Sequence, residues 1–345
     1  MAQFERSTDA LVIGAGVIGL STALALRRAG LRVTVKERGA VGRGSASWAG
    51  GGILSPLEPG GVEDASLPIL RESLAMYPGW CDTVQSLSGV DPEYRICGMQ
   101  VQAPADAGEW EAFFEARCGL RVEPARRATG AADEIAWLPD VAQVRSPRLL
   151  RALAGAFVAA GGVMSEHEAV LGLERQGDRV TGVRTAGGVQ AAAVVVLAAG
   201  AWSEAMSDQA PVRPVRGQML LLEAAPGEFD AIVLRDGRYL IPRRDGPVLV
   251  GSTLEDAGFA DEVTDAARAS LLESAGVMAP RLAQRRVLAH WSGLRPALRT
   301  AGPCIVDWAA GTRGLFLNTG HHRLGITLAP GSAQKAMRAI LADAQ

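Results

Sequence analysis

The sequence predicts a protein of the α/β class (α+β overall), in which a nucleotide-binding unit is joined to a second domain. Three observations support this prediction. A glycine-rich strand–helix–strand pattern occupies residues 9–37, and an amphipathic helix followed by short strands occupies residues 149–204. A chain of 345 residues is also longer than one average domain. We therefore expect two domains.

The composition excludes several classes of protein. With 48% hydrophobic and 21% charged residues, the chain has the balance of a soluble globular protein, and its net charge of −2 favours neither nucleic acid nor an anionic membrane as a partner. The four cysteines (Cys81, Cys97, Cys118 and Cys304) show no CxxC spacing, so neither a disulfide framework nor a metal site is expected. No segment has the pattern of a signal peptide or a transmembrane helix, which indicates a cytoplasmic protein.

The N-terminal segment "DALVIGAGVIGLSTALALRRAGLRVTVKERG" reads as strand, turn, helix and strand. Residues 9–13 form a short apolar run, which is typical of a buried strand. Apolar residues then recur at helical spacing over 20–29, and Gly30 ends the helix. The β-branched run 32–37 predicts a second strand.

Three glycines give this segment a GxGxxG motif with specific physical roles. Gly14 permits the tight turn, Gly16 lets a pyrophosphate approach the backbone, and Gly19 lets the helix and strand pack closely. The start of the helix offers free N–H groups and a positive dipole end to the phosphates. Glu37 follows at the end of the second strand, where its carboxylate would accept hydrogen bonds from ribose hydroxyls and repel the 2′-phosphate of NADP.

The next stretch, "RGAVGRGSASWAGGGILSP", favours FAD over NAD. It leaves the second strand for a loop of serine and glycine instead of another amphipathic helix. The small residues Ser45, Ala46, Ser47 and 50–52 let backbone amides crowd a flat, polar-edged ring and a phosphate. An ordinary flexible loop is the alternative interpretation.

Together with four later segments, these stretches resemble the family of FAD-dependent amino-acid oxidases that includes D-amino acid oxidase and sarcosine oxidase. Within it, the similarity is greatest to the glycine oxidases of bacterial thiamine biosynthesis. The later segments are "VRGQMLLL", "YLIPRRDGPVLVGSTLEDAGF", "WSGLRPALRTAGPCIV" and "GLFLNTGHHRLGITLAP". The resemblance covers essentially the whole chain. Because Cys304 lies beyond the point at which sarcosine oxidases attach FAD through a cysteine, we expect noncovalent FAD.

The resemblance implies a Rossmann-like FAD-binding domain and a discontinuous, mostly antiparallel β substrate domain. The expected FAD-binding domain comprises residues 1–80, 141–204 and 286–345, and the substrate-binding domain comprises 81–140 and 205–285. The sequence is consistent with this division, since "AAVVVLAAGAWS" suits a buried parallel strand that returns to the nucleotide-binding sheet. The family also implies a homo-oligomer.

The resemblance also implies which residues hold the cofactor. The segment "GHHRLGIT" would meet the pyrimidine edge of the flavin, with amides from His321 to Thr327 and the helix dipole stabilising negative charge at N1 and the C2 carbonyl. We expect His321 to act mainly through its backbone. Val170 would hold the adenine through its backbone. The full expected set is Gly14, Ala15, Gly16, Val17, Ile18, Gly19, Glu37, Arg38, Ser45, Ala46, Gly50, Gly51, Gly52, Val170, Gly200, His321, His322, Leu324, Gly325, Ile326 and Thr327.

An amino-acid substrate needs a carboxylate clamp, for which a planar guanidinium is well suited. Arg295 matches the family's carboxylate-binding arginine, Tyr239 matches the tyrosine whose hydroxyl assists it, and Arg323 matches a second arginine on the substrate side. Ile53 and Leu254 would line the side-chain compartment. Without the resemblance, a surface or interdomain salt bridge would be the favoured interpretation of Arg295. Tyr239 could equally be an ordinary strand residue, and the two apolar residues could belong to the core.

These features predict the oxidation of glycine or another small amino acid or amine to an imine, which hydrolyses to an oxo acid and ammonia. The electrons would pass to O2 and give hydrogen peroxide. One alternative is a D-amino acid dehydrogenase that uses a quinone or another carrier, because "ALRTAG" and the pair His322 and Leu324 depart from the glycine-oxidase pattern. A flavin- or nucleotide-binding module without catalytic activity is a third possibility.

Overall fold

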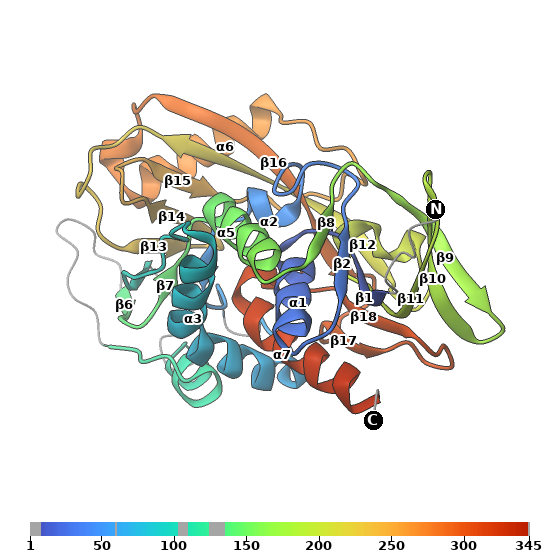
Figure 1. Cartoon of the computed structure of the whole chain (residues 1–345). Helices are drawn as coiled ribbons and strands as arrows, with labels where there is room; N and C mark the ends of the chain where they lie inside the picture. Colours follow the sequence, from blue (N-terminus) through green and yellow to red (C-terminus); the bar gives the residue numbers. More distant parts are fainter. Residues whose placement is uncertain (1–7, 59–60, 103–109, 124–134, 344–345) are drawn as a thin grey trace.

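The computed structural model describes residues 8–58, 61–102, 110–123 and 135–343. Within these residues the strands form three sheets of eight, seven and three strands (Figure 1). The sequence therefore folds into the mixed α/β class that its patterns predict. Two parts of the expected segment 81–140, residues 103–109 and 124–134, lie outside the described residues.

The eight-stranded sheet contains the glycine-rich N-terminal unit. Its core has the order β8–β2–β1–β11–β18, and these neighbours are all parallel. β17 adds to one edge of it, and β10 and β9 extend β11 as an antiparallel meander. The strands are β1 (Thr8–Ile13), β2 (Val33–Lys36), β8 (Val163–Ser165), β9 (Val170–Gln176), β10 (Arg179–Thr185), β11 (Gly188–Leu197), β17 (Ile305–Trp308) and β18 (Leu315–Thr319).

The strand order reverses between β1 and β11, which places a crevice beyond their carboxyl ends. Both strands are buried in this region because their side chains from 10–13 and 195–197 are almost entirely apolar. "AAVVVLAAGAWS" therefore contains the buried parallel strand that the sequence predicts. The residues of β11 just before it, 188–191, pair antiparallel with β10. Such a switch point is where open α/β sheets bind nucleotides.

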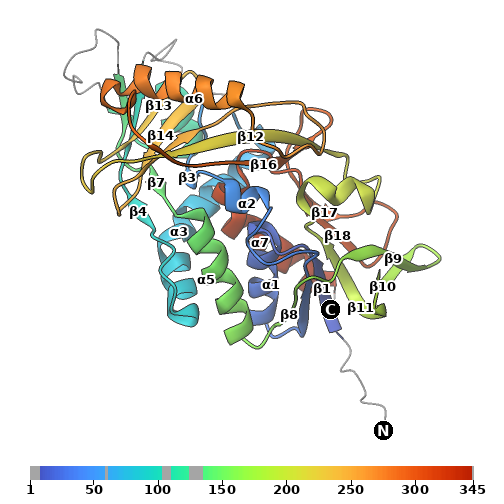
Figure 2. The ribbon, with the colours of Figure 1, turned by 90° about the horizontal axis from the view of Figure 1, so that it is seen from above.

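Four helices pack together on one side of this sheet (Figure 2). They bury Leu20, Leu24, Leu153, Phe157 and Ala336, among others, in the largest apolar cluster of the molecule. Apolar spacing of three and four residues puts these side chains on one face of each helix. The helices are α1 (Val17–Arg28), α3 (Leu67–Ser88), α5 (Ser146–Ala159) and α7 (Gly325–Asp343).

The seven-stranded sheet forms the second layer, with α6 (Asp265–Met278) on its outer side (Figure 2). Its order is β16–β12–β15–β14–β13–β5–β6, and all neighbours except β13 and β5 are antiparallel. The strands are β5 (Met99–Gln102), β6 (Ile135–Leu138), β12 (Val212–Leu222), β13 (Ile232–Arg235), β14 (Arg238–Pro242), β15 (Val248–Gly251) and β16 (Val287–Leu298).

Two expected domain boundaries differ from the boundaries of these elements. β16 was expected in the FAD-binding segment 286–345, but it pairs with β12 from Val212↔Leu298 to Leu222↔Val287 and so belongs to the second sheet. The boundary at residue 80 falls inside the continuous helix α3. Periodicity alone could not assign β16, because pairing between strands distant in sequence decides which sheet a strand joins.

The remaining elements are short and connect the two larger layers. A three-stranded sheet comprises β3 (Ile53–Leu54), β4 (Arg95–Ile96) and β7 (Ala142–Gln143), while α2 (Ala46–Ala49) and the 3-10 segment η3 (Gly200–Ala205) lie beside β16 and β12. Among the described residues, no helix is both long and apolar enough to cross a lipid bilayer.

Candidate active site

A cavity of about 790 Å³ runs between the nucleotide-binding sheet and the seven-stranded sheet. Its volume lies in the upper part of the range for ligand sites. Ile13 and Ala198 line it at the carboxyl ends of β1 and β11, which is the switch point of the parallel sheet. Val170 and Glu37 line one part of the cavity, and Tyr239 and Arg295 line another.

The glycine-rich turn has the geometry that its motif predicts. Gly14 has φ +100°, and a Cβ there would lie 2.6 Å from the carbonyl oxygen of Ala198. A Cβ on Gly19 would lie 1.9 Å from the carbonyl oxygen of Gly14, so close packing of helix and strand requires this glycine. A Cβ on Gly16 would meet only the Ser47 hydroxyl at 3.4 Å, which leaves open space beside the start of α1. The turn thus fits a pyrophosphate group.

Glu37 is held in place by backbone N–H groups. Its carboxylate accepts hydrogen bonds from Ala15 N at 2.8 Å and Gly39 N at 3.0 Å, and its side chain also lines the cavity. Ala15 therefore orients the acid instead of lining the cavity itself. Next to Glu37, the guanidinium of Arg38 lies 3.5 Å from the ring centre of Trp202, and both residues line the cavity beside Glu37.

The Gly50–Gly52 loop is fixed through its carbonyl groups. The carbonyl of Gly50 accepts from the Ser146 hydroxyl at 2.7 Å, that of Gly51 from Arg243 Nη2 at 2.7 Å, and that of Gly52 from Val144 N at 2.9 Å. Because a trans peptide points its N–H opposite to its carbonyl, the next N–H group in each case is directed away from these donors. All three glycines line the cavity, as predicted for a loop that crowds a flat ring.

Arg243 is a functional residue that the sequence reasoning missed. Its side chain is 5% exposed, and burial lowers the pKa of its guanidinium to about 10. Besides Gly51, it donates to Gln143 Oε1 and the carbonyl of Val144. The run "PRRDG" reads as a turn, so only its contacts distinguish Arg243 from its exposed neighbour Arg244.

The "GHHRLGIT" segment forms the loop before α7 and the first turn of that helix. His321, His322, Gly325 and Ile326 line the cavity as expected, but Leu324 and Thr327 do not. The prediction that all amides from His321 to Thr327 face the flavin needs correction, because the amide of His322 donates to the Pro296 carbonyl at 2.9 Å and that of Leu324 to the His321 carbonyl at 2.9 Å. Both donors precede Gly325, the first residue of α7: the backbone of β16 uses the amide of His322, and a turn within the loop uses that of Leu324.

The two histidines are neutral for physical reasons. His321 is 4% exposed, its Nε2 lies 2.8 Å from the Ser332 hydroxyl, and burial lowers its pKa to about 3. Burial also lowers the pKa of His322 to about 4, assisted by the positive charges of Arg295 and Arg323. His322 has φ +45°, an uncommon conformation for a residue other than glycine. Its imidazole therefore enters the cavity as an uncharged group.

Arg295 has the environment of an anion clamp. Its side chain extends from β16 across Gly217 of β12, where a Cβ would lie 2.0 Å from Arg295 Nη2. The guanidinium donates to the carbonyl of Thr253 at 3.1 Å and to the Ser252 hydroxyl at 2.8 Å, which are both neutral acceptors. Among the described residues no carboxylate forms an ion pair with it, and burial lowers its pKa. A buried cation without a counter-ion attracts an anionic ligand.

Tyr239 lies beside this clamp because two glycines make room for its ring. A Cβ on Gly251 would lie 2.8 Å from its hydroxyl oxygen, and one on Gly51 would lie 3.3 Å from its Cε2. The tyrosine is 6% exposed and lines the cavity, as does Ile53. The hydroxyl therefore stands between the clamp and the Gly50–Gly52 loop.

Arg323 also lines the cavity, but it has partners of its own. Its Nη2 donates to the carbonyl of Gly237 at 3.2 Å, and its Nη1 lies 3.6 Å from Glu58 Oε1. Leu254 does not join these residues. It is 53% exposed and absent from the cavity wall, because the segment after β15 continues along β12 and directs this side chain outward. The expected role of Leu254 in the side-chain compartment is therefore not supported by its position.

Comparison with known proteins agrees with this geometry. A family model described as FAD-dependent oxidoreductase (DAO) matches residues 9–338. The chain is 41% identical to the glycine oxidase of Pseudomonas aeruginosa, over 95% of this chain and 93% of that protein. It is 31% identical to the bifunctional protein ThiO/ThiG of Trichormus variabilis, over 97% of this chain and 52% of that longer protein.

A solved structure shares the fold closely. The glycine oxidase of Bacillus cereus superimposes with a TM-score of 0.89 at 25% identity, covering 98% of this chain and 96% of the other. The glycine cradle, the acid at the end of β2 and the small-residue loop are consistent with FAD as the ligand of the cavity. The chain belongs to the FAD-dependent oxidoreductase (DAO) family.

Proposed function

We propose that this enzyme oxidises the Cα–N bond of glycine or another small α-amino acid. The observation that carries the proposal is the buried guanidinium of Arg295, which lines the cavity and donates to the neutral acceptors Ser252 and Thr253, with the Tyr239 side chain beside it. An α-carboxylate would supply the missing negative charge and would accept the two parallel N–H donors of a planar fork. The Tyr239 hydroxyl would donate a further hydrogen bond to it.

The protein residues would bind and orient the substrate. With the carboxylate held by Arg295 and Tyr239, the α-carbon would lie toward the Gly50–Gly52 loop, which faces the same part of the cavity. Bound FAD would supply the hydride acceptor and the route of the electrons to O2. In total, the amino acid, O2 and water would give the oxo acid, ammonia and hydrogen peroxide. His322 is neutral and would offer a hydrogen bond to the substrate amine without repelling it.

Several observations support a small substrate and a connection to thiamine. Ile53 and Tyr239 are both nearly buried and close the cavity beside the clamp. The glycine oxidase of Pseudomonas aeruginosa and the ThiO/ThiG protein align with nearly all of this chain. The sequence resemblance implies that the product serves the thiazole part of thiamine. Growth of a deletion strain without thiamine, with and without this gene on a plasmid, tests that role.

The central experiment mixes purified holoenzyme with glycine in air and measures glyoxylate, ammonia and hydrogen peroxide in equal amounts. A parallel anaerobic series follows bleaching of the flavin absorbance with glycine, sarcosine, D-alanine and D-proline. Bleaching without peroxide in air would instead support a dehydrogenase that uses another acceptor. An absence of bleaching with every compound would refute the proposal.

We also propose that the FAD is noncovalent and that the protein is a cytoplasmic homo-oligomer. None of the cysteines in the described part of the chain lines the cavity, and Cys304 lies instead near the Ser66 hydroxyl, at 3.7 Å. Acid precipitation should therefore release the flavin into the supernatant. Light scattering after size-exclusion chromatography measures the number of subunits, and cell fractionation measures the location.

A further inference from the structure

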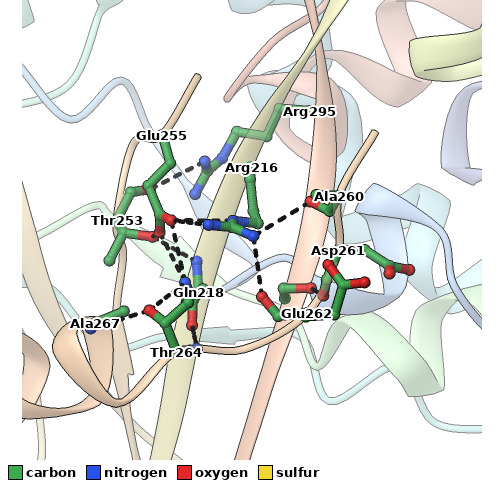
Figure 3. Close-up of polar contacts among 11 residues, drawn as sticks. Arg216, Gln218, Thr253, Glu255, Ala260, Asp261, Glu262, Thr264, Ala267 and Arg295 are labelled. Atoms are coloured by element: carbon green, nitrogen blue, oxygen red, sulfur yellow. Dashed lines mark hydrogen bonds and ion pairs between the residues drawn. The ribbon is translucent and has the colours of Figure 1, made fainter. Parts of the chain in front are cut away.

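The segment 252–264, which connects β15 to α6, supplies both acceptors that hold Arg295. Figure 3 shows the bond from Arg295 to Thr253. It follows β12 without belonging to a sheet, and backbone hydrogen bonds join Glu255 to Arg216 in both directions. Thr253 N donates to the carbonyl of Gln218, whose own amide donates to the Thr253 hydroxyl. The position of Ser252 and Thr253 therefore depends on the contacts that hold this segment against β12.

An ion pair between Arg216 and Glu255, together with several hydrogen bonds, holds the segment 252–264 against β12. Arg216 donates to Glu255 Oε2 from Nε at 3.0 Å and from Nη2 at 2.6 Å, and its Nη1 reaches the carbonyl of Glu262 at 3.1 Å (Figure 3). Gln218 Nε2 donates to Glu255 Oε1 at 3.0 Å and to Thr264 Oγ1 at 3.2 Å, and the Thr253 hydroxyl also donates to Glu255. These donors lower the pKa of Glu255 against the opposing effect of burial.

The network and the clamp occupy opposite faces of one strand. Side chains alternate along β12, so Arg216 and Gln218 point to one face while Gly217 leaves the other face free for Arg295. Gln218 is fully buried, and the side chains of Arg216 and Glu255 are only 12% and 25% exposed. An ion pair so shielded from water holds its geometry more firmly than a surface pair.

We propose that Arg216 and Glu255 are positioning residues for the carboxylate clamp. By locking residues 252–255 to β12, they place the Thr253 carbonyl and the Ser252 hydroxyl where these acceptors aim the guanidinium of Arg295 into the cavity. Arg216 also forms the ion pair with Glu255, at 2.6 Å, so that this carboxylate has a cationic partner other than Arg295. This inference rests on the proposed function, since it assumes that the clamp binds a carboxylate.

The test measures the dissociation constant of acetate, a carboxylate that cannot be oxidised, by titrating the flavin absorbance of the holoenzyme. Arg216→Met should raise this constant about tenfold, Glu255→Gln about fivefold, and the double variant no more than Arg216→Met alone, because both changes break one interaction. Arg216→Lys should recover part of the affinity. With amino acids, KM should rise in parallel while kcat stays within about twofold.

A matched control uses an exposed ion pair at the other end of β12, where this strand pairs with the start of β16. Arg286, before β16, pairs with Glu223, after β12, at 3.0 Å, and their side chains are 69% and 50% exposed. Arg286→Met should leave the acetate constant unchanged. Arg216→Met could fail to yield folded holoenzyme. In that case Arg216→Lys and Glu255→Gln must each still raise the dissociation constant of acetate above that of Arg286→Met.

The outcomes separate this inference from the proposed function. If Arg216→Met lowers the melting temperature but leaves acetate binding within twofold of the wild type, the pair is only structural and the inference is wrong. If the wild type binds acetate but oxidises no amino acid, the proposed function fails while the positioning role is still measured. If the wild type does not bind acetate at all, the clamp assignment and this inference both fail.

Discussion

The two ends of the cavity are built in different ways. The adenosine end is built around one continuous stretch, residues 14–47, in which Gly19 packs against Gly14 and Glu37 accepts from Ala15 and Gly39, although Gly14 also packs against Ala198. The clamp end is assembled from β12, β14, β16, the segment 252–255 and the loop before α7. The geometry of the adenosine end depends mainly on local backbone conformation. The geometry of the clamp end depends on pairing between strands distant in sequence and on contacts between their side chains.

This difference has a consequence for the effects of mutation. At the adenosine end, a change should act through backbone geometry and affect folding or FAD binding. At the clamp end, a change should act on substrate affinity and leave the cofactor in place, because the sheet itself persists. Variants at both ends of the cavity distinguish these two kinds of effect.

Arg295→Leu should lower kcat/KM for the amino-acid substrate about a thousandfold or more, because the carboxylate would enter a buried site without its cation. FAD content should stay at the level of the wild type. Steady-state kinetics and the flavin-to-protein absorbance ratio check both statements. Turnover with unchanged apparent affinity would show that Arg295 is not the clamp.

Gly19→Ala should destabilise the protein by about 3 kcal/mol, since its Cβ would lie 1.9 Å from the backbone oxygen of Gly14. Denaturant unfolding measures this change. Gly79→Ala serves as the control, because a Cβ at this helical position meets nothing within 4 Å and should leave stability the same or slightly higher. Equal stability of the two variants would contradict the packing role of Gly19.

Gly217→Ala should reduce kcat/KM about a hundredfold, because the new methyl group would occupy the place of the Arg295 guanidinium. The sheet is held by neighbouring pairs of β12 and β16, so the melting temperature should fall far less than in Gly19→Ala. Kinetics and thermal unfolding of the same preparation distinguish the two effects. A loss of FAD in this variant would contradict the expectation that changes at the clamp end leave the cofactor in place.

Gly16→Ala should raise the dissociation constant of FAD about tenfold while leaving the apoprotein as stable as the wild type. The new methyl group would meet only the Ser47 hydroxyl and would project into the space beside the start of α1. Fluorescence titration of apoprotein with FAD measures the effect. A fall in apoprotein stability comparable to that of Gly19→Ala would mean that this glycine serves packing instead.

The smallest effect concerns pH. The folded protein holds His321 neutral with a pKa of about 3, whereas the unfolded chain binds a proton below its ordinary pKa of 6.5. Stability is therefore complete above pH 6.5 and falls as the pH drops below it, by about 1 kcal/mol between pH 6 and 5 from this residue. His321→Gln, which does not titrate, should show a shallower decline in melting temperature over the same range.

Much of the fold was predictable because its signals are local. The turn at Gly14, the close packing at Gly19 and the acid at Glu37 follow from motif spacing and backbone geometry, and the structure shows all three in place. β16 was expected with the FAD-binding segments, but it pairs with β12, a partner that its own sequence pattern does not reveal. Leu254 was expected in the cavity from resemblance alone, yet the path of its segment along β12 turns it outward.

The nucleotide-binding unit follows from local sequence, since the conformations of its glycines and the 3.6-residue and two-residue periodicities are properties of short segments. The sequence also marked Arg295, Tyr239 and Arg323 through resemblance. Only the tertiary structure decided that Gly217 and Gly251 make room for the first two, that Arg243 holds the Gly50–Gly52 loop, and that Arg216 and Glu255 fasten the segment behind the clamp. These contacts join residues far apart in the chain, and no local pattern specifies which distant side chains will share a buried space.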